Sequence, residues 1–379
     1  MESAQRQPPE PSTQRAAEKI GAWLDRIDPG SHRRIKGLRL VTAYAIAAML
    51  GVVLQRVYGL PGGTSLSFLA AGFALWASVS EGQATRWLCA RDLAILNAAA
   101  ALGAASLIWL APIHANRGRP GAEWVLVTGA FLVGYLKRFG ILGAGVGSQI
   151  YIGQLLAYGE GSTRTDLPLV ALAAVIGAAA SIVPRVLSGP AEHPALSADS
   201  SMPLNQRLAS RELRMGLQAG FSALVIVLVN SVVDLRESAW AITASTYVIA
   251  GSASGTVHRV RQRIVGTLIG VPLGIACLPI ATHLPPLAWL LAALAMIIYA
   301  MGLPERYDVA CAAYAFTLMV TLAVSGETSI SILAARAWET LLGGALGVVT
   351  AKSIFPLTTA PASPPAASPS ARSEPQPEE

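Results

Sequence analysis

Long apolar stretches, separated by short polar or basic segments, run through most of this chain. A bilayer core of about 30 Å needs about 20 apolar residues per helix, and a window of that length predicts twelve membrane-spanning helices. They lie at residues 38–57, 62–80, 91–111, 123–139, 140–158, 167–187, 213–233, 238–256, 263–282, 285–303, 307–325 and 333–355. The predicted fold class is therefore all-α, in a polytopic membrane protein.

Polar segments divide the chain into two membrane blocks. In chain order we expect a polar N-terminal tail at 1–36, a first block at 37–187, a linker rich in Pro and Ser at 188–210, a second block at 211–355 and a low-complexity, disordered tail at 356–379. The first tail lacks the apolar core of a signal peptide. Its segment 15–27 has one apolar helical face, which either lies on the membrane surface or packs on the bundle.

The two blocks resemble each other in sequence. A Leu-Arg pair opens each block, at 38–39 and at 213–214, and a basic-aromatic pair precedes both the fifth and the eleventh span. Six spans per block give the blocks the same orientation, so we predict two parallel six-helix repeats, which in transporters commonly meet at a central pathway. The alternative is that any two arginine-capped six-helix blocks align in this way.

Composition and charge agree with a membrane protein and predict its orientation. Only 13% of the residues are charged and 53% are hydrophobic, whereas a soluble domain carries about 25% charged residues; this excludes a soluble enzyme, a disordered chain and a nucleic-acid-binding module. With twelve spans and a cytoplasmic N-terminus, 22 basic residues fall inside, five outside and one within a span, which accounts for all 28. The positive-inside rule then places both termini in the cytoplasm.

Regularly spaced glycines predict close helix packing in the second block. Gly266, Gly270 and Gly274 recur every fourth residue, as Gly343 and Gly347 do in the last span, and such spacing lets a neighbouring helix approach closely.

The segment QRIVGTLIG at 262–270 resembles the QRxxGTxxG signature of the fusaric acid resistance (FUSC) and aromatic acid exporter family. The resemblance extends over about 211–356 and includes the last span, from Arg336 to Gly347. Larger members of the family carry a sizeable cytoplasmic domain, for which this chain offers only its linker. The resemblance implies a bacterial inner-membrane efflux protein for aromatic or other organic acids, and some relatives work with a periplasmic adaptor subunit.

Carboxylate export calls for cations that bind the acid group and apolar walls for the rest of the molecule. A charge at bilayer depth costs at least about 2.5 kcal/mol and usually faces a cavity or a partner, so such charges are candidates for function. The predicted substrate-binding residues are Arg263, Arg306, Arg336, Thr267 and Thr340. The competing interpretations are positive-inside anchoring, snorkelling to the surface and ion pairs exposed to water.

The proton gradient is the expected energy source, because the sequence contains no ATP-binding motif. The candidate proton carriers are Glu339, Asp308 and Asp92. Glu339 follows Arg336 by three residues, so the two side chains can pair on one helical face.

The sequence is also compatible with other functions. A passive organic-anion channel is one, because plant malate channels resemble this family and arginine rings also serve conduction; a non-transporting scaffold is another. A membrane enzyme would need paired carboxylates or a metal cluster. The spacing of the five histidines and three cysteines does not form a set of metal ligands. We therefore expect no metal, cofactor or enzymatic activity. The expected partners are a small organic anion, the lipid bilayer, an adaptor subunit and a second copy of the chain, but no nucleic acid.

Overall fold

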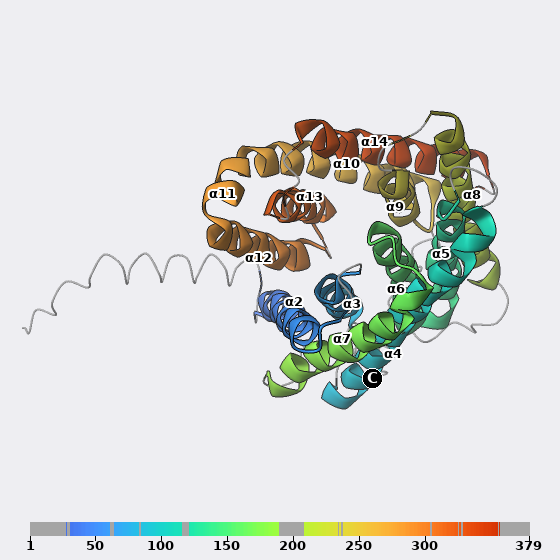
Figure 1. The fold of residues 1–379 in the computed structure, drawn as a ribbon. Helices are drawn as coiled ribbons and strands as arrows, with labels where there is room; N and C mark the ends of the chain where they lie inside the picture. The colour runs from blue at the N-terminus through green and yellow to red at the C-terminus, as the bar shows by residue number, and fades with distance from the viewer. Residues whose placement is uncertain are drawn as a thin grey trace, which may run out of the picture.

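The computed structural model of this chain is built of packed helices (Figure 1). It describes residues 28, 31–60, 64–82, 85–115, 121–188, 208–233, 235, 238–303, 305–324, 326, 329–354 and 356. These residues contain no β-strand. The all-helical class predicted from the apolar pattern is confirmed, while most of the two predicted tails and most of the linker lie outside the described residues.

Helices occupy most of the ranges that the apolar pattern predicts. In chain order they are α2 (His32–Val57), α3 (Leu66–Ser80), α4 (Arg86–Ala115), α5 (Glu123–Tyr135), η1 (Leu136–Phe139), α6 (Gly140–Gly159), η2 (Arg164–Asp166), α7 (Leu167–Leu187), α8 (Leu208–Val233), α9 (Ser238–Val248), α10 (Ala253–Ala276), α11 (Leu278–His283), α12 (Pro285–Gly302), α13 (Tyr307–Val324) and α14 (Ile330–Ser353).

The boundary between α9 and α10 differs from the prediction. The helix expected at 238–256 ends at Val248, and the next begins at Ala253 instead of at 263. The Ser252 Oγ accepts a hydrogen bond of 3.1 Å from the Gly255 N–H and so caps the start of α10. The basic run that looks like a loop is thus helical, since arginine and glutamine are good helix formers. Arg263 consequently lies about 15 Å inside the helix.

The chain reverses direction between α5 and α6, where the apolar run shows no polar loop. Gly140 has a φ of 75°, a left-handed value that glycine adopts without strain. The two helices then pack on each other, and a Cβ added at Gly147 would lie 2.4 Å from the Leu132 carbonyl oxygen. The predicted division at 139/140 is therefore correct.

Seven stretches of the described structure are long and apolar enough to cross a bilayer. They are His32–Val57, Arg86–Ile113, Glu123–Gly159, Arg164–Leu187, Arg211–Val233, Pro285–Gly302 and Tyr307–Val324. By contrast, α9 has only 11 residues, which gives a length of about 16 Å, and α10 carries three arginines in its first half. Twelve membrane spans are therefore not confirmed and stay a prediction.

The helices form two groups that meet at two joints (Figure 1). Helices α2 to α7 pack among themselves, as do α8 to α14; α12 packs on α2 at one joint, and α5 packs on α8 and α9 at the other. Glycines bring the backbones together at both joints: an added Cβ would lie 2.9 Å from the Ile297 Cα at Gly37 and 2.4 Å from the Gly216 N at Gly134.

Close contact between α10 and α13 gives a first testable prediction. A Cβ added at Gly270 would lie 2.2 Å from the Ala312 carbonyl oxygen. Leucine at this position must push the helices apart, so we expect Gly270→Leu to destabilise the protein by about 1–3 kcal/mol or more. Thermal unfolding in detergent measures the effect. The matched control is Gly159→Leu, because nothing lies within 4 Å of a Cβ there; equal melting temperatures for the two variants would contradict the packing account.

Candidate functional site

Aromatic side chains from both helix groups meet between the groups. Trp76 of α3 contacts Tyr299 of α12 and Tyr314 of α13, with ring centroids 6.3 and 5.6 Å apart, and the two tyrosines lie 6.0 Å from each other. The rings of Tyr151 on α6 and Tyr247 on α9 are 6.0 Å apart, and both lie within electrostatic range of Tyr314. We call these five residues the aromatic cluster.

Hydrogen bonds join the same helices across the space between the two groups. The hydroxyls of Ser148 and Tyr247 are 2.7 Å apart, and those of Tyr151 and Thr243 are also 2.7 Å apart. Tyr151 is fully buried, while Tyr247 is half-buried. Phenol rings and hydroxyls, as well as aliphatic side chains, therefore line the contact between the groups.

Arg263 of α10 contacts Tyr307 and lies within electrostatic range of the aromatic cluster. Its Nη1 lies 3.5 Å from the Tyr307 Oη, and its charge acts on Tyr314, Tyr247 and Tyr151. Its Nε is buried, and within the described residues this atom has no hydrogen-bond partner. No carboxylate of that part of the chain forms an ion pair with Arg263. The guanidinium can therefore accept an external anion as its partner.

The same side of α10 carries Thr267 and the packing glycines. Thr267 lies one turn after Arg263 and is only 6% exposed. A Cβ added at Gly266 would lie 2.5 Å from the Asp308 carbonyl oxygen, so α10 touches α13 at this level. The structure thus brings Arg263 and Thr267, two of the predicted substrate-binding residues, to the interface with α13.

The other predicted substrate-binding residues lie elsewhere. Arg306 is at the surface just before α13, and its Nε and Nη2 lie 3.1 and 2.9 Å from the carboxylate oxygens of Asp308. Water solvates this ion pair, so the two charges are stable at the surface of the protein. Arg336 belongs to α14, but its side chain lies outside the described part of the structure. Thr340, also on α14, is half-buried.

The three candidate proton carriers differ in their surroundings. Asp92 is buried and accepts hydrogen bonds of 3.1 and 2.9 Å from the Nε and Nη2 of Arg91. Asp308 pairs with the arginine two residues before it. Glu339 is 2% exposed and lies one turn before Gly343, the glycine at which α14 touches α9. Asp92 and Asp308 thus form ion pairs with arginines, and both Asp92 and Glu339 are buried.

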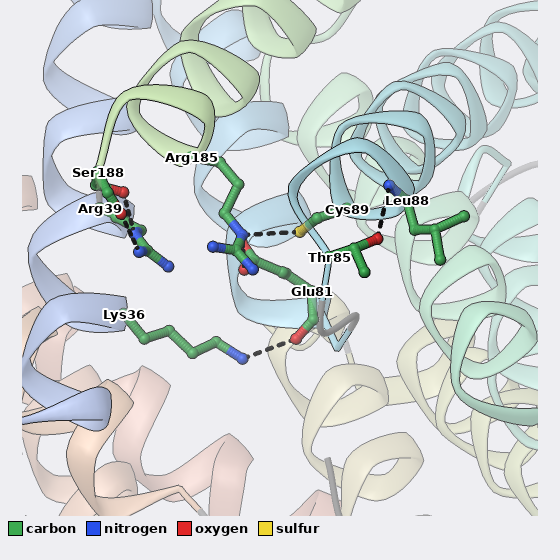
Figure 2. A network of polar contacts seen from close by, with 8 residues as sticks. All are labelled: Lys36, Arg39, Glu81, Thr85, Leu88, Cys89, Arg185 and Ser188. Atoms are coloured by element: carbon green, nitrogen blue, oxygen red, sulfur yellow. Dashed lines mark hydrogen bonds and ion pairs between the residues drawn. The ribbon is translucent and has the colours of Figure 1, made fainter. Parts of the chain in front are cut away.

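A second polar centre lies where α2 and α4 begin and α3 and α7 end (Figure 2). The Arg185 Nε lies 2.7 Å from the Glu81 Oε1 and 3.2 Å from the Cys89 Sγ. The Arg185 side chain is 1% exposed and that of Glu81 6%. Lys36 donates a 2.9 Å hydrogen bond to the Glu81 carbonyl oxygen. The ion pair is therefore out of water, and the contacts around it join the ends of four helices, α2, α3, α4 and α7.

Arg39 completes this centre. It donates to the Oγ and to the carbonyl oxygen of Ser188, at 2.5 and 2.8 Å (Figure 2). We call Lys36, Arg39, Glu81 and Arg185 the basic cluster, and this side of the bundle the basic end. Three cations against one carboxylate leave the cluster with a formal charge of about +2. Sequence reasoning missed it because its members come from three helices, and a basic residue in the last turn of α7 is common at any helix C-terminus.

Polar contacts also link the two helix groups at both ends of the bundle. At the basic end, Arg33 of α2 forms an exposed ion pair with Glu305, which follows α12. The hydrogen bond from Arg33 and its charge hold the pKa of the Glu305 carboxyl below its usual range. At the opposite end, buried Glu123 of α5 accepts hydrogen bonds of 2.8 Å from Asn230 and 2.5 Å from Ser238. The two helix groups are thus linked by an exposed ion pair at the basic end and by buried hydrogen bonds at the opposite end.

Part of the chain is similar to a known protein family. Residues 223–350, about a third of the chain, match the family model described as fusaric acid resistance protein-like. The range contains Arg263 and Thr267, and the resemblance seen in the sequence is confirmed there. No curated protein matches the chain significantly. No solved structure matches it either. Together with the apolar helices, the family match supports a multi-pass membrane protein. In the described residues no group of His, Cys, Asp and Glu is placed to hold a metal.

Proposed function

We propose that this chain, with its fusaric acid resistance protein-like second half, is a transporter that exports aromatic and other organic carboxylates across the bacterial inner membrane. Arg263 carries the proposal: it has no carboxylate partner among the described residues, and it lies within electrostatic range of the tyrosines of the aromatic cluster. A carboxylate pairs well with a guanidinium through charge-assisted hydrogen bonds. The apolar part of the same molecule would lie against the tyrosine and tryptophan rings.

The order of helix neighbours supports a route between two equivalent halves. Helix α4 packs on α6 as α10 packs on α13, and α3 packs on α7 as α9 packs on α14. The joints correspond as well, since α5 meets α8 on one side and α12 meets α2 on the other. Two six-helix repeats related by a two-fold axis would give this pattern, and paired repeats commonly enclose the pathway. The aromatic cluster lies where the two groups of helices meet.

The basic residues support export from the cytoplasm. The basic cluster adds to the excess of arginine and lysine at the basic end, which the positive-inside rule assigns to the cytoplasm. Substrate would then move from the basic end, past Arg263 and the aromatic cluster, to the opposite end. Both chain termini would lie in the cytoplasm.

Proton coupling through Glu339 is the proposed energy source, because it is a buried ionisable group on an apolar helix. A passive anion channel is the second candidate, because two of the three candidate proton carriers, Asp92 and Asp308, form ion pairs with arginines. The two differ in one measurable respect: a proton uncoupler stops coupled export but leaves channel flux unchanged.

Efflux from loaded cells tests the proposal. Cells with and without the expressed protein would be loaded with radiolabelled benzoate or with an aliphatic acid such as malate, and the loss of label would be followed with and without an uncoupler. We expect severalfold faster loss of benzoate from the expressing cells and an effect of the uncoupler. Equal rates for every acid in the two cell types would contradict the proposal, and acceleration that the uncoupler leaves unchanged would favour the channel.

A further inference from the structure

A pocket of about 170 Å³ opens at the basic end, where α2 meets α3 and α12. Both basic and apolar side chains line it. Its basic side chains are His32, Arg33 and Lys36 of α2, and its apolar side chains include Leu40, Val79 and Ala300. No acidic residue is among those that line it. We call it the basic pocket.

The size of the basic pocket suits a single ring with a small substituent. An engineered protein cavity of about 150 Å³ binds benzene, so a pocket of about 170 Å³ has room for a ring that carries one carboxylate. Leu40, Val79 and Ala300 offer that ring an apolar surface.

The positive charge of the basic side chains favours an anion as the ligand of the basic pocket. Lys36 lines the pocket and also belongs to the basic cluster, which has three cations and one carboxylate. Arg33, one helical turn away, is engaged by Glu305, whose side chain is 66% exposed. Water already solvates that carboxylate, so exchanging it for a bound anion costs little. A carboxylate in the pocket would meet Lys36 and Arg33 together.

The basic pocket adjoins the aromatic cluster. Val79 lies one turn after Trp76 on α3, and Ala300 directly follows Tyr299 on α12. Trp76 and Tyr299 contact each other in the aromatic cluster. A ligand in the pocket would therefore lie about one helical turn from those rings, towards the basic end.

We propose that the basic pocket binds small aromatic carboxylates before they reach Arg263. The direction of this step rests on the proposed function. The ligand chemistry, a carboxylate on an apolar ring, comes from the pocket itself.

Binding of benzoate to purified full-length protein in lipid nanodiscs, measured by calorimetry, tests this inference. An Arg263→Met background removes the central cation, so that the remaining binding reports on the pocket. In that background we expect Lys36→Met to weaken benzoate binding about tenfold or more, since a hydrogen bond to a charged group contributes about 1.5–3 kcal/mol. The control Lys352→Met removes an exposed lysine of α14 and should leave the affinity unchanged.

A gain of affinity gives a test that misfolding cannot imitate. Glu305→Gln releases Arg33 from its ion pair, so we expect severalfold tighter benzoate binding. Benzyl alcohol, which lacks the charge, and inorganic phosphate, which lacks the ring, should bind at least tenfold more weakly than benzoate. Equal binding of phosphate and benzoate, or unchanged affinity in both the Lys36→Met and the Glu305→Gln variants, would overturn the inference.

The outcomes also separate this inference from the proposed function. If benzoate binding depends on Lys36 but the protein transports no acid, the binding role of the basic pocket is supported and the transport proposal is refuted. If the protein transports acids but its benzoate affinity does not depend on Lys36 and Glu305, the transport proposal stands and the binding role of the basic pocket is refuted.

Discussion

Arg263→Met is expected to lower benzoate efflux about ten- to hundredfold. The guanidinium offers a carboxylate a positive charge near the aromatic cluster, and in the described structure it has only the Tyr307 hydroxyl, 3.5 Å away, as a neutral partner. Hydrogen bonds to charged groups contribute about 1.5–3 kcal/mol, which corresponds to this range of affinity. Methionine keeps much of the apolar stem, so the change removes mainly the charge. The initial rate of label loss from benzoate-loaded cells measures the effect.

Two further variants separate the charge of Arg263 from its place in the helix. Arg263→Lys keeps the charge but loses the planar fork that binds a carboxylate through two hydrogen bonds, so we expect an intermediate rate. Arg261→Met removes an exposed arginine two residues earlier on α10 and should transport normally. Wild-type efflux in a well-expressed Arg263→Met variant would remove this residue from the mechanism.

Glu81→Leu is expected to destabilise the protein by about 3–5 kcal/mol, because it leaves the buried Arg185 without its carboxylate. The Arg185 side chain is 1% exposed and cannot turn to water. Lys36 and Arg39 lie within electrostatic range of Arg185, so their repulsion adds to the cost. Thermal unfolding in detergent, followed through the yield of monodisperse protein, measures the loss.

The double variant Glu81→Leu/Arg185→Met tests the cause of that loss. Replacing both members of a buried ion pair by apolar residues is often neutral, so we expect the double variant to regain most of the stability. Glu305→Gln, which breaks the exposed pair with Arg33, should change the unfolding temperature little. A double variant as unstable as Glu81→Leu would show that the pair itself is not the source of the effect.

Hydropathy predicts the helices of this fold well, because burial in lipid or protein requires apolar runs. The reversal at Gly140 could be placed in the same way, since a run of this length exceeds one membrane span. The start of α10 could not: its first turns are basic, and a hydropathy window excludes arginines even where the backbone is helical. Helix propensity and the Ser252 cap decide that boundary.

Only part of the candidate site could be predicted from the sequence. Arg263 could be found because it stands in a recognisable motif beside an apolar run. The aromatic cluster could not, because tyrosine and tryptophan are expected at the membrane surfaces, and no local pattern relates Trp76 to Tyr314. The pair of Glu81 and Arg185 was missed for the same reason: contacts between distant helices depend on the three-dimensional packing.

Uptake of radiolabelled benzoate into proteoliposomes that contain only the purified protein tests the central claim most directly. The assay is run at alkaline pH, where the acid is ionised and leaks slowly through lipid. The account predicts saturable uptake that exceeds that of protein-free liposomes, responds to an imposed proton gradient and falls at least tenfold in Arg263→Met. Uptake equal to that of protein-free liposomes, or saturable uptake that is the same with and without Arg263, would contradict it.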